Sequence, residues 1–386
     1  MSWRILQGDC IEQMKTLEDQ SVNTCVTSPP YFGLRDYGTA SWEGGDPDCE
    51  HVGSVARTAA PGSEKQASNL GALSVMSGDC AACGATRVDA QIGLEPTPDE
   101  FVQALVEVFR DVRRVLRDDG TVWLNLGDSY AAQRGGTAMP AETLAGGAGG
   151  KGDAAAHRGR KISEAPKGAQ EASPSRNAAV AHRNARAFGL KQKDLIGIPW
   201  LVAFALRADG WYLRQDIIWH KPNPMPESVQ DRCTKAHEYI FLLSKSKTYF
   251  YDAEAVAEDV VKGAAGSSFS DGQTAIHQLG RASDTERIEQ PRRNKRSVWT
   301  VTTKPFSGAH FATFPPDLIE PCILAGSPEG GTVLDPFAGS GTTGMVALRH
   351  NRSFVGCELN PEYVDIARRR ILDDAPLMNQ VSELAA

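Results

Sequence analysis

Short apolar runs without regular polar alternation recur along the chain. They lie at residues 121–127, 216–220, 239–244, 332–337 and 353–359. Strands that are buried on both faces have this pattern, because neither side of such a sheet meets water. The N-terminal segment MSWRILQGDC and the segment SVNTCV at residues 21–26 add two more expected strands.

Helical periodicity separates these runs, and the clearest helix is predicted over residues 97–120. Thr97 can cap this helix, Pro98 suits its first position, and Glu100 completes a capping box. Gly120 is expected to end it. One apolar stripe runs along it, formed by Phe101, Leu105, Val108, Val112 and Val115.

Further helices are predicted at residues 198–210, 342–351 and 360–372. Helices interleaved with buried strands are typical of an α/β fold whose sheet is mostly parallel. The pattern therefore predicts one large α/β core.

Two stretches have too few large apolar side chains to become ordered by themselves. Residues 131–187 are rich in Ala, Gly, Ser, Arg and Lys, and residues 256–297 are a milder version. We expect both to be low-complexity insertions at the edge of the sheet, flexible until a partner orders them.

Basic residues are gathered locally although the net charge of the 386 residues is −7. Residues 131–190 hold nine Lys/Arg and four Asp/Glu, and RRNKR follows at 292–296. Two interpretations stay open: a surface for an anionic polymer, and solvated loops that keep the protein soluble.

Composition and hydropathy narrow the class of protein. The chain is 41% hydrophobic and 23% charged, as in soluble globular proteins. No stretch approaches 18 apolar residues, so no membrane span is expected. The N-terminus lacks the apolar core of a signal peptide, and we expect a cytoplasmic location. Eight cysteines in such a chain indicate reduced thiols or metal ligands.

The segment TVLDPFAGSGTTGMVALRHNRSFVGCELNPEY predicts a nucleotide-type ligand site. An expected strand ends at Asp335, a turn carries Gly339 and Gly341, and Glu358 ends the next strand. This is the βαβ arrangement in which a helix N-terminus meets the ligand and a carboxylate holds the ribose. The spacing from Gly339 to Gly344 also matches the dinucleotide pattern, so the turn alone leaves NAD open.

A second motif, TSPPY at residues 27–31, accompanies this turn. Together, TSPPY and VLDPFAGSGTT resemble the S-adenosylmethionine-dependent DNA amino-methyltransferases, which methylate exocyclic amines of cytosine or adenine. The segments 6–31, 217–246 and 310–327 resemble further parts of this family. The target-base motif precedes the cofactor motif, which is the family's β-type order. The resemblance implies a Rossmann-like methyltransferase sheet with a circularly permuted motif order.

The resemblance also implies the site residues. Ser28, Pro29, Pro30 and Tyr31 would be catalytic. Glu358 would hold the ribose of the cofactor and Asp9 would lie near its adenine, with a plain turn residue as the alternative for Asp9. The remaining cofactor contacts would be His310, Phe314, Pro315, Asp335, Phe337, Ala338, Gly339, Gly341 and Thr342.

The chemistry of an exocyclic amine explains the residue types in TSPPY. The amine is a poor nucleophile because its lone pair is delocalised into the ring. The Ser28 hydroxyl and the Pro29 carbonyl can accept hydrogen bonds from it, and the prolines fix the backbone that carries them. Tyr31 can stack on a base that has been flipped out of the duplex. By pattern alone, a Pro-Pro turn that ends a strand is the alternative.

The target base is predicted from the first residue of the motif. Family members with Ser there mostly act on cytosine N4, and those with Asp or Asn mostly act on adenine N6. Ser28 therefore favours cytosine N4, with adenine N6 as the alternative. A methyltransferase acting on protein or RNA and a catalytically silent DNA-binding regulator are the competing classes.

Four potential metal ligands lie between the two halves of the predicted catalytic region. They are Cys49, His51, Cys80 and Cys83. The pair Cys80-x-x-Cys83 is typical of a structural zinc site, whereas C-x-H is tighter than the usual first pair. We predict structural zinc, with unlinked thiols in a loop as the alternative. A zinc deaminase is disfavoured because the sequence after His51 lacks the required Glu.

The predicted layout has a divided catalytic half at 1–41 and 94–130, a zinc insertion at 42–93, a basic insertion at 131–187, the rest of the catalytic sheet at 188–255, a target-recognition region at 256–300, a cofactor half at 301–372 and a tail at 373–386. The expected partner is double-stranded DNA, and a homodimer and a cognate restriction enzyme are further hypotheses. Candidate phosphate contacts are Lys221, Arg232, Arg292, Arg293, Lys295 and Arg296.

Overall fold

A computed structural model describes the chain at residues 2–33, 37, 39–49, 51, 79–80, 82–131, 189–191, 193–259, 292–304, 313–374 and 382–383. The predicted insertion 131–187 lies outside these ranges apart from Ala131, and so does His310. None of the helices in the described ranges combines the length and the apolar character that a bilayer-crossing segment needs.

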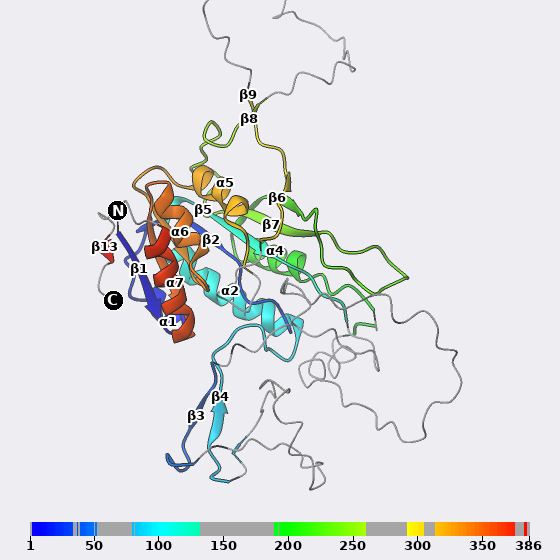
Figure 1. Ribbon diagram of the computed structural model, residues 1–386, viewed down its shortest axis with the longest axis vertical. Coiled ribbons are helices and arrows are strands. Elements are labelled where there is room, and N and C mark those ends of the chain that lie inside the picture. The colour runs from blue at the N-terminus through cyan, green and yellow to red at the C-terminus, as the bar shows by residue number, and fades with distance from the viewer. Residues whose placement is uncertain are drawn as a thin grey trace, which may run out of the picture.

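One sheet of nine strands forms the centre of the described structure (Figure 1). Its spatial order is β10-β6-β7-β5-β2-β11-β12-β1-β13. Among these strands only β7 is antiparallel to its neighbours, so the predicted mostly parallel sheet is confirmed. The strands are β1 (Ser2–Gln7), β2 (Val22–Thr27), β5 (Leu116–Leu126), β6 (Tyr212–His220), β7 (His237–Ser244), β10 (Val298–Thr300), β11 (Thr332–Asp335), β12 (Ser353–Glu358) and β13 (Ser382–Glu383).

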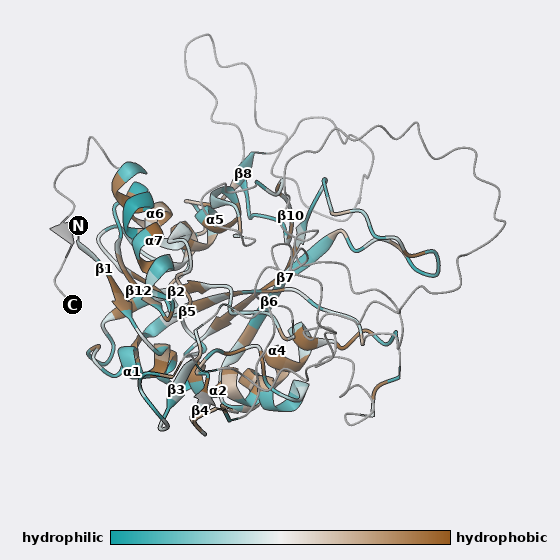
Figure 2. Ribbon diagram, turned by 60° about the horizontal axis from the view of Figure 1, so that its bottom comes forward, coloured by the Kyte–Doolittle hydropathy of each residue, from teal (hydrophilic) through white to brown (hydrophobic). Residues whose placement is uncertain are grey.

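Helices cover both faces of this sheet (Figure 2). One apolar layer contains side chains of α1 (Cys10–Met14), α2 (Pro98–Val115) and α4 (Ile198–Ala208). The opposite layer contains side chains of α5 (Pro316–Gly326), α6 (Thr342–Arg349) and α7 (Pro361–Asp374). Because both faces are covered, the central strands are buried on each side, which explains their lack of polar alternation.

Helix α2 begins as predicted and ends earlier. Thr97 caps it by accepting a hydrogen bond from the Glu100 amide at 3.0 Å, and the whole predicted stripe is buried. The prediction that the helix continues to Gly120 was wrong. Leu116 takes an extended conformation and pairs with Val22 of β2, so the strand β5 starts directly after the helix.

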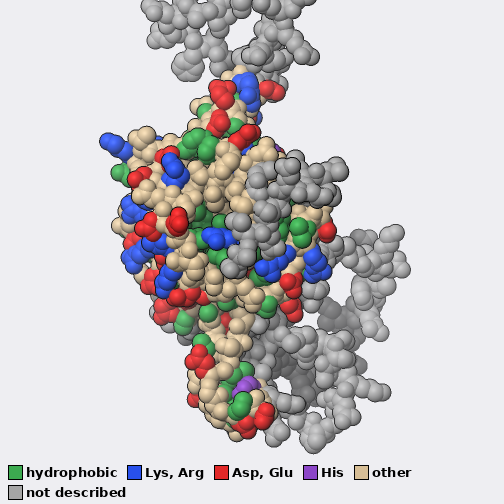
Figure 3. Space-filling model, turned by 90° about the vertical axis from the view of Figure 1, so that its left-hand side faces the viewer, with side chains coloured by type: hydrophobic (Ala, Val, Ile, Leu, Met, Phe, Trp, Pro, Cys, Tyr) green, Lys and Arg blue, Asp and Glu red, His purple; other side chains and the backbone are tan. Residues whose placement is uncertain are grey.

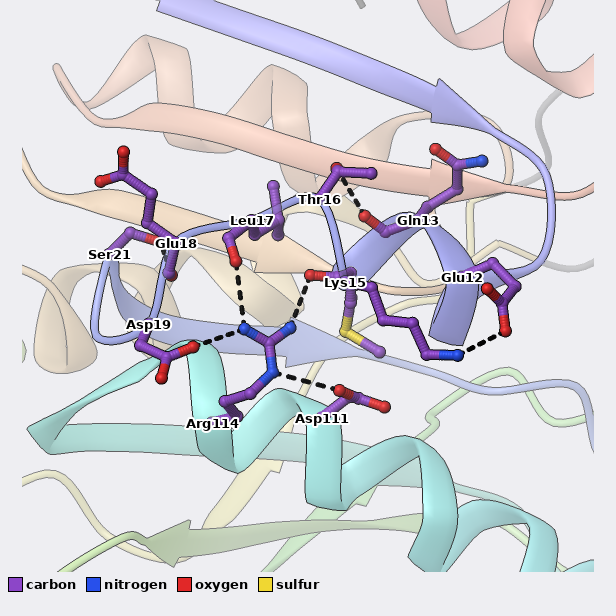
Figure 4. Close-up of polar contacts among 11 residues, drawn as sticks. Glu12, Gln13, Lys15, Thr16, Leu17, Glu18, Asp19, Ser21, Asp111 and Arg114 are labelled. Carbon is purple, nitrogen blue, oxygen red and sulfur yellow. Dashed lines mark hydrogen bonds and ion pairs between the residues drawn. The ribbon is translucent and has the colours of Figure 1, made fainter.

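Arg114 on α2 fastens the segment that leads from α1 to β2 (Figure 4). Its guanidinium donates to the carbonyls of Met14 and Leu17 at 2.7 and 3.1 Å and pairs with Asp19 at 2.6 Å. Asp111, one helical turn earlier, accepts a further hydrogen bond at 3.3 Å. These contacts hold the start of β2 against the helical layer.

A small antiparallel hairpin projects from the body, formed by β3 (Ser41–Glu43) and β4 (Thr86–Val88) (Figures 1 and 3). At its base the Gly33 amide donates to the Gly93 carbonyl at 2.8 Å, and Thr39 donates to Asp89 at 3.0 Å. The chain therefore leaves and re-enters the body at one place. A second short hairpin pairs β8 (Glu258–Asp259) with β9 (Arg292–Arg293).

Candidate active site

The two sequence motifs lie on neighbouring parallel strands. Val333 and Leu334 of β11 pair with Thr24 and Cys25 of β2. Both strands therefore end at the same edge of the sheet, where β2 leads into Ser28 and β11 leads into the glycine turn. In an open α/β sheet, this carboxyl edge is where ligands bind.

Asp335 ties the two motifs together. Its carboxylate accepts hydrogen bonds from the hydroxyls of Thr27 and Thr343, each at 2.6 Å, and from the Phe337 amide at 3.0 Å. The side chain is 1% exposed, and this burial raises the pKa of Asp335 to about 6 although the hydrogen bonds act in the opposite direction. Thr27 and Thr343 belong to the two sequence motifs but were not predicted as site residues, because the motifs do not show that both hydroxyls meet one carboxylate.

The glycine turn has the backbone shape that the motif implies. Gly339 and Gly341 have φ angles of +52° and +75°, in the region that disfavours residues with a Cβ. At Gly341 an added Cβ would lie 2.9 Å from the Cβ of Ala367 on α7. At Gly339 it would meet only the Phe337 carbonyl at 3.9 Å, so this side of the turn leaves room for a ligand. The turn then enters α6, whose N-terminus can interact with polar ligand groups.

Glu358 stands at the end of β12, beside this turn. Its carboxylate accepts hydrogen bonds from the amides of Gly339 at 2.8 Å and Asn360 at 2.9 Å. Burial raises the pKa of Glu358 above its ordinary value. The register pairs Gln7 with Glu358, which places Asp9 at the same edge. The Asp9 carboxylate caps α1 by accepting from the amides of Ile11 and Glu12, each at 3.0 Å.

The other expected cofactor residues surround the turn to different degrees. Phe337 and Phe314 are half-buried, and Ala338 and Pro315 are buried, with Pro315 directly before α5. The Thr342 hydroxyl accepts a hydrogen bond from Arg370 on α7 at 2.7 Å. The same guanidinium donates to the Ser340 hydroxyl at 2.7 Å, so Arg370 braces the turn from behind, a role that the sequence did not signal.

Tyr31 lies in a polar cluster at the end of the sheet. Its hydroxyl is 2.9 Å from Glu238, 3.3 Å from Asn125 and 3.5 Å from the Ser28 hydroxyl. Burial, followed by the charge of Glu238, raises the pKa of Tyr31 well above its ordinary value. Asn125 and Glu238 were not predicted, since they come from β5 and β7 and only the fold brings them to the motif.

Cysteines near the motif are unsuited to nucleophilic attack. Cys25 and Cys10 are buried, and burial raises the pKa of both thiols, that of Cys10 to about 12. Because the thiolate is the reactive form, chemistry that passes through a covalent cysteine intermediate is disfavoured at these positions.

The four expected metal ligands come together at the tip of the β3–β4 hairpin. The ligand atoms of Cys49, His51, Cys80 and Cys83 all lie within 4.8 Å of one another. Cys49 Sγ is 3.9 Å from Cys80 Sγ, and Cys83 Sγ is 3.3 Å from His51 Nδ1. A tetrahedral zinc with normal bond lengths separates two sulfurs by about 3.8 Å and a sulfur from a nitrogen by about 3.6 Å, so the donor set fits that ion.

Two further contacts shape this cluster. Trp42 of β3 stacks on the His51 ring with centroids 5.0 Å apart. Burial acts to raise the pKa of the Cys80 thiol, but hydrogen bonds from the amides of Cys83 and Ala82 and from the side chains of His51 and Cys83 together lower the value to about 6. Such amide donors are typical of a thiolate metal ligand.

The basic residues predicted to contact phosphate are already engaged within the chain. Lys221 pairs with Glu238, and Arg232 pairs with Glu227 while its guanidinium lies 3.8 Å from the Tyr130 ring centroid. On the face seen in Figure 3, basic and acidic side chains are interspersed. The other predicted phosphate contacts are Arg292, Arg293, Lys295 and Arg296. Each of them contacts Ala257, Glu258 or Trp299.

Comparison with known proteins identifies the family. Residues 22–369 match the model of the DNA methylase family of N6 and N4 methyltransferases. Type II methyltransferase M.Cfr9I of Citrobacter freundii is 40% identical over 367 residues, which cover 95% of this chain and 87% of the relative. Type II methyltransferase M.SmaI of Serratia marcescens is 39% identical over 371 residues, covering 96% and 91%.

A solved structure agrees with the fold. The cytosine-N4-specific PvuII DNA methyltransferase superposes with a TM-score of 0.50 at 14% identity, over 99% of this chain and 96% of that one. The family match favours S-adenosylmethionine over NAD for the glycine turn. The chain belongs to the DNA methylase family, the S-adenosylmethionine-dependent DNA amino-methyltransferases, and it is an enzyme that methylates DNA.

Proposed function

We propose that this enzyme transfers the methyl group of S-adenosylmethionine to N4 of a cytosine that has been flipped out of duplex DNA. The observation that carries the proposal is the Thr27–Asp335 hydrogen bond of 2.6 Å, which joins the strand leading into Ser28 to the strand leading into the glycine turn. A methyl donor bound at the turn and a base held at Ser28–Tyr31 are then close enough for one displacement step.

The transfer is a direct displacement. The amine nitrogen forms a bond to the methyl carbon while the carbon–sulfur bond breaks, and its electron pair stays on sulfur as a neutral thioether. The nitrogen becomes cationic and then releases one of its protons to water. Ser28 and the Pro29 carbonyl contribute by accepting hydrogen bonds from the amine, which restores electron density on the nitrogen. Positioning is the main contribution of the protein.

The cofactor is held by residues at the carboxyl edge of the sheet. Glu358 at the end of β12 receives the ribose hydroxyls, and the open side of Gly339 receives the methionine portion near the N-terminus of α6. Asp335 keeps both loops in place with a buried carboxylate that accepts three hydrogen bonds.

Serine at position 28 supports cytosine N4 over adenine N6 as the target. The test is to incubate the purified chain with S-adenosylmethionine and duplex DNA, digest the DNA and identify the methylated nucleoside by mass spectrometry. N4-methyldeoxycytidine is expected. N6-methyldeoxyadenosine would move the target to adenine. Parallel incubations with RNA and protein and with DNA alone separate the other substrate classes and a silent regulator. The Type II names of the relatives support the hypothesis of a cognate restriction enzyme.

We also propose that Cys49, His51, Cys80 and Cys83 hold a structural zinc ion. Four protein ligands leave no open coordination position, so the ion would brace the hairpin rather than take part in methyl transfer. Metal analysis of the purified chain is expected to find one zinc per molecule, and Cys80→Ser to lose it. The matched control is Cys233→Ser, an exposed cysteine outside the cluster. Full zinc content in Cys80→Ser would contradict the assignment.

A further inference from the structure

Glu238 reaches the catalytic segment because β7 runs against the other strands. Its first residues therefore lie at the edge where the parallel strands end. The register pairs Leu126, the last residue of β5, with Tyr239, and Trp219 of β6 with Glu238. The Glu238 carboxylate, at the start of β7, is therefore placed beside the carboxyl ends of β5 and β6.

The carboxylate of Glu238 has three partners, and the side chain is 16% exposed. Oε2 accepts from the Tyr31 hydroxyl at 2.9 Å and from the Asn125 amide at 3.3 Å. Oε1 pairs with the Lys221 ammonium, whose side chain is 19% exposed. Lys235 and His237 are the other titratable groups nearby, and burial lowers the pKa of both.

The Tyr31 ring is closely confined. An added Cβ at Gly127 would lie 2.5 Å from the ring carbon Cε2, so the absence of a side chain there gives the ring its place. The Asn125 amide nitrogen also donates to the Tyr239 carbonyl at 3.1 Å, which turns the Asn125 oxygen toward Tyr31. Both neighbours of the Tyr31 hydroxyl on this side therefore accept hydrogen bonds.

We propose that Glu238 is a positioning residue that sets the direction of a hydrogen-bond chain from the substrate amine through Ser28 and Tyr31. A carboxylate in an ion pair can only accept, so Tyr31 donates to Glu238 and its oxygen is left to accept from Ser28. Ser28 then turns its proton toward Tyr31, and its lone pairs face the amine. The Ser28–Tyr31 distance of 3.5 Å is long, as catalytic hydrogen bonds often are before substrate binds.

This direction is what the proposed methyl transfer needs, and the inference rests on that function. A serine that donated its proton to the amine nitrogen would occupy the lone pair that attacks the methyl group. The alternative is a purely structural ion pair between Glu238 and Lys221 that joins β6 to β7.

Substitution by glutamine separates the two accounts. In Glu238→Gln the Lys221 ammonium attracts the amide oxygen, so the amide nitrogen faces Tyr31 and donates to it. The acceptor that fixes the chain direction is then replaced by a donor while size and packing are retained, and Tyr31 is left with the more distant acceptor Asn125 at 3.3 Å. We expect the rate constant of single-turnover methylation of duplex DNA, and with it kcat, to fall about 100-fold. The steady-state KM for both substrates should stay within about threefold of the wild type. A near-normal kcat in this variant would overturn the inference.

Two combinations make the test specific. In Lys221→Met with Glu238→Gln, the amide can turn its oxygen to Tyr31, and about tenfold of the lost rate is expected to return. In a Tyr31→Phe background, Glu238→Gln is expected to have no further effect, because the residue acts through the hydroxyl. Two results would each contradict the proposal. One is a further loss of rate when Glu238→Gln is added to Tyr31→Phe, and the other is no recovery of rate when Lys221→Met is added to Glu238→Gln.

Controls keep the outcome interpretable. Glu320→Gln makes the same change at a glutamate on α5 that hydrogen-bonds His350 at 2.7 Å, and it is expected to leave methylation unchanged. Thermal unfolding identifies any variant that fails to fold. The wild-type chain is assayed first. If it produced no methylated DNA, the proposed function would fail, whereas normal wild-type activity with an unaffected Glu238→Gln would reject the positioning role alone.

Discussion

Asp335 and Glu238 stand at the same edge of one sheet in opposite surroundings. Asp335 is 1% exposed and accepts from the neutral donors Thr27, Thr343 and the Phe337 amide. Glu238 is 16% exposed and lies between Lys221 and Tyr31. The comparison teaches that a carboxylate enclosed by neutral donors holds loops in place, whereas one in a charged, partly open cluster can direct a reaction.

Asp335→Ala is expected to have the largest effect. It removes the acceptor that joins Thr27 of β2 to Thr343 of α6 and to the Phe337 amide, so the glycine turn loses its anchor. Calorimetry should show S-adenosylmethionine affinity falling more than about 100-fold, while DNA affinity is retained. Asp335→Asn is the matched control. Its oxygen can serve Thr27 and its nitrogen can donate to Thr343, so binding should stay near normal.

Tyr31→Ala is expected to show the reverse pattern. It removes the ring that we propose stacks on the base and the donor to Glu238, and kcat should fall about 100-fold. Cofactor affinity should remain within about threefold of the wild type. Equal loss of cofactor binding in Tyr31→Ala and Asp335→Ala would mean that the two clusters act as one unit, which would break the comparison.

The pH dependence of stability is the smallest expected difference. The folded-state pKa of Asp335 is about 6, above the ordinary value of 3.8, so the folded chain binds this proton more tightly than the unfolded chain. The stabilising contribution is complete below about pH 4 and is lost as the pH rises through 6. The free energy of unfolding of the wild type relative to Asp335→Asn should therefore fall by about 1–3 kcal/mol across this window, measured by denaturant unfolding. A difference that does not change with pH would place the Asp335 pKa near its ordinary value.

Local patterns along the chain predicted most of the sheet and its main helices. The α2 stripe and the buried runs that became β5, β7, β11 and β12 were visible because burial on both faces leaves a compositional trace. The end of α2 was not visible, since Leu116 leaves the helix to pair with Val22, a partner 94 positions earlier. Long-range pairing overrides local helix propensity in such places.

The candidate site shows the same division. Residues in contiguous motifs, such as Ser28 and Gly339, could be named from the sequence. Asn125, Glu238 and Arg370 could not. Strand order and register bring Asn125 and Glu238 to the site, and the packing of α7 brings Arg370 there. His310 and most of the basic insertion lie outside the described residues. Their proposed roles remain predictions.

The hydrogen bond of 2.8 Å between the Gly33 amide and the Gly93 carbonyl has a practical consequence. It closes the polypeptide on itself where the hairpin leaves the body, and the Thr39–Asp89 hydrogen bond closes it again further out. That second junction is accordingly a natural graft point. A foreign module with closely spaced ends could replace residues 40–88, because the Tyr37 contacts with Asn360 and Tyr363 of the body would be kept.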